Sequence, residues 1–218
     1  MNFKELKSRH RLLRKSLPDN LNLRVHRALS WLQRAEMADD IDGRFIFLWI
    51  AFNAAYACEI DERWRLSEQE TFREFLDKLC LLDTTKQIDH LVWQEFSNSI
   101  RILLDTPFVL QGFWDFHRGK ITESEWKERL SQGKRIASQA LSSGNTPQLL
   151  SVIFNRLYTV RNQLIHGGAT WNSSINRAQL KDCTKLLYKL IIVLIDLMMS
   201  NPDALWGEVC YPIVIHSF

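Results

Sequence analysis

Apolar residues recur at helical spacing along most of the chain. In one early segment they stand at Val25, Ala28, Leu29, Leu32 and Ala35. Positions three and four apart share one face of a helix, so this spacing predicts an amphipathic helix. Similar segments predict further helices as far as residue 199, and two of them open with capping boxes, formed by Ser67 with Glu70 and by Thr122 with Glu125. Thr84 or Thr85 is expected to cap a helix that continues to Leu103, and Asn172 or Ser173 to cap the last long helix, over residues 174–199. The pattern as a whole predicts an all-α fold, a single helical bundle of about eight helices.

Two segments are apolar nearly all round, residues 45–58 and residues 186–199. Each has about 14 residues, whereas a helix needs roughly 20 to cross a bilayer. Asn53 interrupts the first segment, and Lys189 and Asp196 interrupt the second. We therefore expect two buried helices of a soluble bundle and no membrane span.

The helix predicted over residues 147–166 carries an unusual set of polar residues. Thr146-Pro147 begins it, and Gly167-Gly168 ends it. At 100° per residue, its apolar side chains fall within one arc of about 160°. The residues of that arc are Leu150, Ile153, Phe154, Leu157, Val160, Leu164 and Ile165.

Arg161 falls inside this apolar arc. A guanidinium there has to be paired, or has to line a cavity or an interface, because burying it alone costs several kcal/mol. Tyr158, Asn162 and His166 stand at the rim of the same arc. The four residues form one contiguous polar patch. Two interpretations are open: a reactive site, or a capping histidine with an arginine that holds helices together through a salt bridge.

The run Arg161-Asn162-Gln163-Leu164-Ile165-His166 resembles the Arg-x4-6-His motif of the HEPN superfamily (higher eukaryotes and prokaryotes nucleotide-binding). In that family a polar residue, commonly Asn, follows the Arg. The Gly167-Gly168 pair and the apolar segment 45–56 are also similar to the family. The resemblance covers residues 21–60 and 146–200 of a single domain, 1–218, and residues 61–145 are interpreted as a helical insertion.

The resemblance implies a metal-independent endoribonuclease that works as a homodimer, with no cofactor. His166 would act as general base or acid on the ribose 2′-hydroxyl or the leaving 5′-oxygen. Arg161 would neutralise charge in the transition state, and Asn162 would orient one of the two. The products would be a 2′,3′-cyclic phosphate and a 5′-hydroxyl.

Three further residues are candidates for substrate binding or support of the motif. Tyr158 lies one turn before Asn162. Asn53 either hydrogen-bonds the motif from behind or is a satisfied core amide. Arg177 follows the Gly-Gly loop and either binds phosphate or is solvated at a helix N-terminus. No metal site is expected, because the acidic cluster Asp39, Asp40 and Asp42 has no matching ligands.

Charge is uneven along the chain. Residues 1–27 carry a net charge of +6, and the remainder a net charge of −3. This basic arm is suited to contact phosphates, or else it is a solvated leading helix. The first residues contain no apolar stretch of a signal peptide, and the four cysteines form no Cys-x-x-Cys pair. We therefore expect a cytoplasmic protein.

Three functions remain open. An active member of the family would act on RNA, as a toxin or defence effector held in check by an antitoxin-like protein partner. A catalytically silent member would bind a nucleotide, an RNA or a protein. A purely structural bundle would have Arg161 paired to a carboxylate and His166 shielded, whereas a nuclease needs both residues open to solvent.

Overall fold

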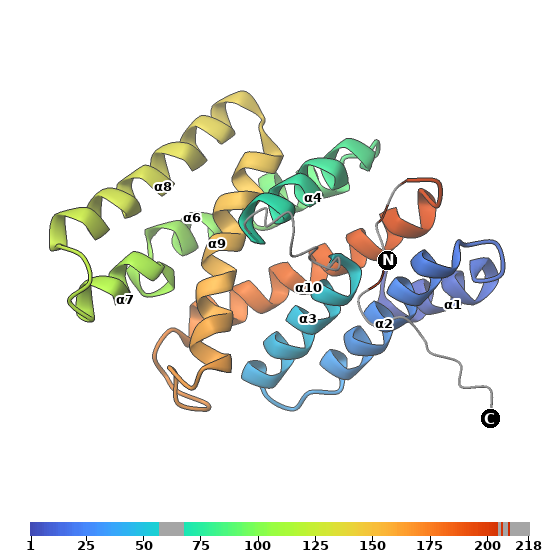
Figure 1. Ribbon diagram of the computed structural model, residues 1–218, viewed down its shortest axis with the longest axis horizontal. Helices are drawn as coiled ribbons and strands as arrows, with labels where there is room; N and C mark the ends of the chain where they lie inside the picture. The colour runs from blue at the N-terminus through green and yellow to red at the C-terminus, as the bar shows by residue number, and fades with distance from the viewer. Residues whose placement is uncertain (57–67, 205, 207–208, 210–218) are drawn as a thin grey trace, which may run out of the picture.

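The computed structural model describes residues 1–56, 68–204, 206 and 209, and within these residues every regular element is helical (Figure 1). The elements are α1 (Phe3–Leu13), α2 (Asp19–Glu36), α3 (Ile41–Tyr56), α4 (Glu68–Leu82), α5 (Gln87–His90), the π-helical turn η1 (Leu91–Glu95), α6 (Ser97–Asp105), the 3-10 turn η2 (Pro107–Val109), α7 (Gln111–His117), α8 (Glu123–Ser143), α9 (Thr146–Ile165) and α10 (Arg177–Ser200). The expected all-α class is confirmed.

The expected count of about eight helices is wrong for the described part of the chain, which has ten α-helices. Residues 3–13 of the basic arm form a helix of their own, α1, and the segment expected as one helix from residue 84 to residue 103 is divided into α5, η1 and α6. The division occurs where the backbone N–H of Phe96 donates to the carbonyl of Leu91, five residues back. This widened turn breaks the helical register, and no Gly or Pro in residues 84–103 predicts the break.

The helix ends show which capping signals operate. The capping box before α8 is confirmed, with Thr122 Oγ1 accepting from the Glu125 N–H and the Glu125 carboxylate accepting from the Thr122 N–H. A second expected capping box, at Ser67 and Glu70, involves a residue outside the described part. The chain enters α10 at Arg177, three residues later than the start expected at residue 174.

The basic arm packs on the bundle. Phe3 and Leu6 of α1 are buried, and Arg9 forms an ion pair with Asp196 near the end of α10. The exposed side of α1 keeps several lysines and arginines. The arm therefore comprises α1 and the first turns of α2, folded onto the protein, with Lys4, Arg11, Arg14 and Lys15 exposed and Arg24 buried.

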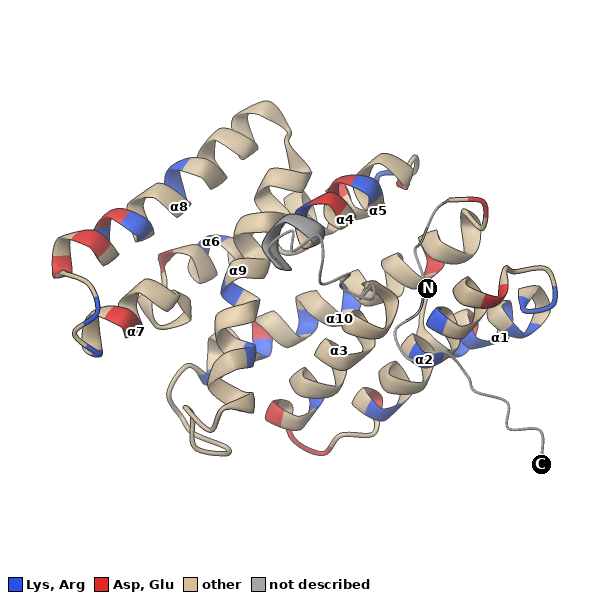
Figure 2. Cartoon of the chain, viewed as in Figure 1, with Lys and Arg blue, Asp and Glu red and all other residues tan. Residues whose placement is uncertain are grey.

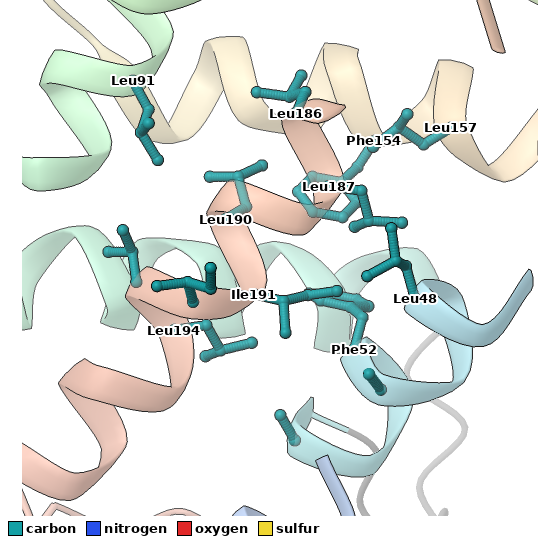
Figure 3. Packing of buried hydrophobic residues seen from close by; sticks show 14 of the residues in the cluster. Leu48, Phe52, Leu91, Phe154, Leu157, Leu186, Leu187, Leu190, Ile191 and Leu194 are labelled. Carbon is teal, nitrogen blue, oxygen red and sulfur yellow. The ribbon is translucent and has the colours of Figure 1, made fainter. Parts of the chain in front are cut away.

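The core is one continuous cluster that joins α3, α9 and α10 (Figure 3). Phe52 of α3, Leu157 of α9 and Ile191 of α10 are buried together there. Leu76 and Leu103, from the segment interpreted as an insertion, belong to the same cluster. Residues 61–145, as far as they are described, thus complete the core that holds the motif helix.

Helix α9 lies in the middle of the molecule, between α8 on one side and α3 and α4 on the other (Figure 1). Its C-terminal end leads into a loop that returns to α10. Within the described residues, no helix combines the length and the apolar character that crossing a bilayer requires.

Candidate functional site

Local sequence signals place the ends of α9, the helix that carries the motif. Asn145 caps its start by accepting a hydrogen bond from the Gln148 N–H at 3.0 Å. After Ile165 the helix ends at His166, and Gly167 follows with φ +65°. Glycine adopts this left-handed conformation without a Cβ penalty. The chain therefore turns away directly behind His166, and the histidine stands exposed at the helix end.

Arg161 is half-buried and has no carboxylate partner among the residues that the structure describes. Its Nη1 donates to Oδ1 of Asn162 at 2.8 Å, and its guanidinium lies 5.7 Å from the ring centroid of Tyr158. Its Nε is buried without a hydrogen-bond partner. A neutral amide and an aromatic ring thus hold the guanidinium, and neither cancels its positive charge.

Asn162 joins the two ends of the motif. Its side-chain oxygen accepts from Arg161, and its backbone carbonyl accepts from the His166 N–H at 3.1 Å. Tyr158 lies one turn earlier and is 37% exposed. The structure therefore gathers Tyr158, Arg161, Asn162 and His166 at the exposed C-terminal end of α9.

Asn53 lies elsewhere. Trp49 of α3 packs against Tyr158 with ring centroids 6.1 Å apart, and Phe52 packs against Phe154 at 4.9 Å. These pairs show that α3 and α9 run in opposite directions, so Asn53 is level with Phe154. That level is about 10 Å along α9 from Arg161. The structure does not bring the half-buried Asn53 to the motif.

Arg177, the first residue of α10, forms an ion pair and a hydrogen bond within the protein. Its Nη1 lies 2.8 Å from Oδ2 of Asp42, and its Nε donates to the Ser173 carbonyl at 2.8 Å. The Asp42 side chain is only 8% exposed and also accepts from the Asn172 N–H. This network ties the loop after the motif to the first turn of α3. In the described part of the chain, no three His, Cys, Asp or Glu side chains are grouped to hold a metal ion.

A pocket of about 180 Å³ lies beside the motif, where the end of α9 meets α7 and the start of α10. Trp114, Gln163, Gly168 and Arg177 are among its lining residues, whereas Arg161 and His166 are not. Gln163 Nε2 donates to the Phe108 carbonyl at 2.7 Å on this side of the helix. The motif and the pocket thus occupy different faces of α9.

A second arginine on α9, Arg156, is not among the residues that the sequence predicted for the site. It is 3% exposed, and its Nε and Nη1 have no hydrogen-bond partner. Burial lowers the pKa of its guanidinium to about 10. The signal was available, because position 156 stands four residues from both Val152 and Val160 and so lies on an apolar row of the helix.

Comparison of the chain with protein-family models, with curated proteins and with solved structures gives no match.

Proposed function

We propose that this protein is a metal-independent endoribonuclease of the HEPN type that works as a homodimer. The observation that carries the proposal is the state of the motif residues. Arg161 keeps an uncompensated charge and donates to the Asn162 side chain, and His166 is exposed. A structural role predicts the opposite arrangement, with Arg161 paired to a carboxylate and His166 shielded.

The chemistry follows from these groups. An imidazole acting as base removes the proton of a ribose 2′-hydroxyl, and the oxygen attacks the adjacent phosphorus. The bond between the phosphorus and the 5′-oxygen of the next nucleotide breaks, and a protonated imidazole donates a proton to this leaving oxygen. Arg161 neutralises the charge that grows on the phosphoryl oxygens. The products are a 2′,3′-cyclic phosphate and a 5′-hydroxyl.

The need for both a base and an acid supports a dimer. Each chain supplies one Arg161 and one His166 in the motif, and a second copy would supply the other pair. Tyr158 and Ile165 flank the motif and are 37% and 43% exposed. Exposed apolar side chains beside a charged cluster are typical of a protein interface.

The alternative is a catalytically silent HEPN module that binds a nucleotide, an RNA or a protein partner. One observation favours a protein partner: Trp171 and Ile175, in the loop directly after the motif, are 71% and 70% exposed. An antitoxin-like protein seated on these residues would also cover His166. The same surface would then serve a toxin or defence effector that is held inactive until released.

The test is RNA cleavage by the purified protein in EDTA, with tRNA and mRNA as substrates and with the ends of the products analysed. We expect 2′,3′-cyclic phosphate ends from the parent protein and none from His166→Ala or Arg161→Ala. Two matched controls remove the same residue types elsewhere on the surface, His90→Ala and Arg101→Ala, where both side chains are exposed. These variants should cleave like the parent.

The dimer is tested separately. Ile165→Asp places a charge beside the motif without touching the reacting groups, and we expect it to yield monomers in sedimentation and to abolish cleavage. Adding an excess of His166→Ala chains to the parent protein should lower the activity per parent chain if each site draws on both copies. Cleavage that survives both motif substitutions would contradict the proposal, and a folded dimer without cleavage would favour the silent module.

A further inference from the structure

A second pocket, of about 730 Å³, lies between α1 and α2. Three of its lining residues are basic, Lys7, Arg11 and Arg14, and one is acidic, Asp19. Figure 2 shows basic residues along α1 and in the turn after it. Three of the eight lysines and arginines in the first 27 residues thus line one cavity.

The pocket wall also carries hydrogen-bonding groups held in place by neighbours. Lys7 Nζ donates to Oε1 of Gln33 at 2.8 Å, and Nε2 of His10 lies 2.8 Å from Oδ1 of Asn22. The ring centroids of His10 and His26 are 6.3 Å apart. These bonds hold polar groups of a partly buried wall in fixed positions, from which they can orient a ligand.

The start of α2 forms another part of the wall, because Asp19 and Asn20 in its first turn line the pocket. The N-terminal end of a helix carries a partial positive charge that adds to the field of the basic side chains. All these contributions favour an anion, apart from the single carboxylate of Asp19.

We propose that the pocket between α1 and α2 binds the phosphate groups of an RNA strand. The inference rests on the proposed function, which supplies RNA as the substrate. Lysine and arginine together neutralise phosphodiesters, and the amide side chains of the wall supply further donors. The volume lies in the range of pockets that enclose a molecule of nucleotide size, so a concave site for a flexible strand fits better than a flat membrane surface.

The pocket is separate from the motif. Helices α2 and α3 lie between α1 and the motif helix α9 (Figure 1). An RNA strand that contacts both the pocket and the motif would be held by the pocket at a distance from the bond that is cut. The pocket would therefore increase affinity for long RNA and leave the chemical step unchanged, so its loss raises KM and not kcat.

The experiment measures RNA binding in the His166→Ala background, where the strand stays intact. The test variant is Arg11→Ala with Arg14→Ala, and the matched control is Lys4→Ala with Lys15→Ala, which removes the same charge from exposed positions outside the pocket lining. The probe is a fluorescent single-stranded RNA of about 20 nucleotides, followed by anisotropy at about 50 to about 200 mM salt. Thermal unfolding by circular dichroism checks that both variants fold.

We expect the pocket variant to bind about tenfold more weakly and the control to stay within about twofold. The slope of log affinity against log salt should fall by about two for the pocket variant. A nucleoside monophosphate should compete better than inorganic phosphate, and polyglutamate should not compete. Equal weakening of the two variants would mean that charge alone acts, and competition by polyglutamate would mean that an acidic protein fits as well; either result would overturn the inference.

The outcomes separate the two proposals. Pocket-specific binding by a protein that does not cleave RNA would support the pocket and contradict the nuclease. Cleavage with a KM that is unchanged in the Arg11→Ala, Arg14→Ala variant would leave the nuclease standing and overturn the pocket.

Discussion

Arg161 and Asn162 are consecutive in the chain, and their side chains leave the helix about 100° apart. Even so, Nη1 of the arginine lies 2.8 Å from Oδ1 of the asparagine. The long arginine side chain bends from the apolar arc toward the rim to make this bond. Asn162 therefore decides which way the guanidinium is aimed, and it does so without adding a charge.

Removing this acceptor should lower RNA cleavage. Asn162→Ala leaves Arg161 charged but badly aimed, and we expect a loss of about tenfold, equivalent to about 1.4 kcal/mol of transition-state stabilisation. Asn162→Asp places a carboxylate on the guanidinium and cancels the charge that the phosphate needs, so the loss should reach about a hundredfold. Initial rates on a defined RNA measure both, and an aspartate variant as active as the parent would contradict a charge-based role for Arg161.

Replacing Arg156 should stabilise the protein. Its guanidinium is buried with two nitrogens unpartnered, so the folded state carries the desolvation cost of that charge. Arg156→Met keeps most of the volume of the side chain and removes the charge, and we expect a gain of about 2 kcal/mol in the free energy of unfolding. Urea titration followed by circular dichroism measures it. A loss of stability would show that the guanidinium makes contacts that outweigh its burial.

Gly133 of α8 lies against the guanidinium of Arg156, and this close approach can be tested together with the burial of the arginine. A Cβ at this position would lie 3.1 Å from Nη2 of Arg156. Gly→Ala inside a helix ordinarily stabilises by up to about 1 kcal/mol. We expect that gain in the Arg156→Met background and little or none in the parent, an interaction energy of about 0.5 to about 1 kcal/mol in a double-mutant cycle. Additive effects of the two substitutions would contradict the close approach.

Arg177 should matter for stability more than for RNA. Arg177→Met leaves the buried carboxylate of Asp42 without its cation, and we expect a loss of about 2 to about 3 kcal/mol in unfolding free energy. Adding Asp42→Asn should recover part of that loss because the unpaired charge is gone. Cleavage per folded molecule should stay within about twofold. Unchanged stability with reduced cleavage would instead assign Arg177 to the RNA.

His10 should make stability depend on pH. Burial lowers the pKa of its imidazole below the ordinary value of 6.5, with His26 and Arg14 adding to the shift and the Asn22 hydrogen bond opposing it. The unfolded chain then binds more protons than the folded one, so the stability that this residue contributes is complete above pH 6.5 and is lost as the pH falls through that value and the lower folded pKa. The direction is thus a decline in unfolding free energy on acidification.

The matched variant for this prediction is His10→Gln, which keeps an amide donor for Asn22 and does not titrate. Urea unfolding of both proteins at about pH 7.5 and about pH 5.5 gives the comparison. The parent should lose more stability than the variant over that interval. Parallel behaviour of the two proteins would show that other groups cause the decline.

Local signals predicted much of the fold. Thr122 with Glu125 marks the start of α8, and Pro147 with Gly167 marks the limits of α9, because each signal acts within a few residues of the chain. The start of α10 was misjudged for the same kind of reason. Asn172 and Ser173 are good capping types, but Asn172 has φ +54° and Ser173 Oγ accepts from the Ile175 N–H inside the loop. Neither residue therefore caps α10, which begins after Asn176 without a side-chain cap.

The part of the candidate site that lies on a single helix was predictable from helical geometry. The spacing of Tyr158, Arg161, Asn162 and His166 puts them at one end of one helix, and the structure has them there. The pairing of Arg177 with Asp42 was not predictable, since 135 residues separate the two partners and only the packing of α3 beside α10 brings them together. The apolar row of α9 indicated that Arg156 is buried, but how closely α8 approaches its guanidinium was not predictable.

Helix α9 is packed between α8 and the pair α3 and α4, and Leu150, Ile153 and Leu157 are almost wholly buried along its length. Close-packed side chains on both flanks do not permit a helix to slide or rotate by small steps. The residues of the motif therefore keep a fixed position on the bundle. Under the proposed function, switching would consist of one molecule meeting another, and the rate below the dimer dissociation constant would rise with the square of the protein concentration. The abundance of the chain would itself act as the signal.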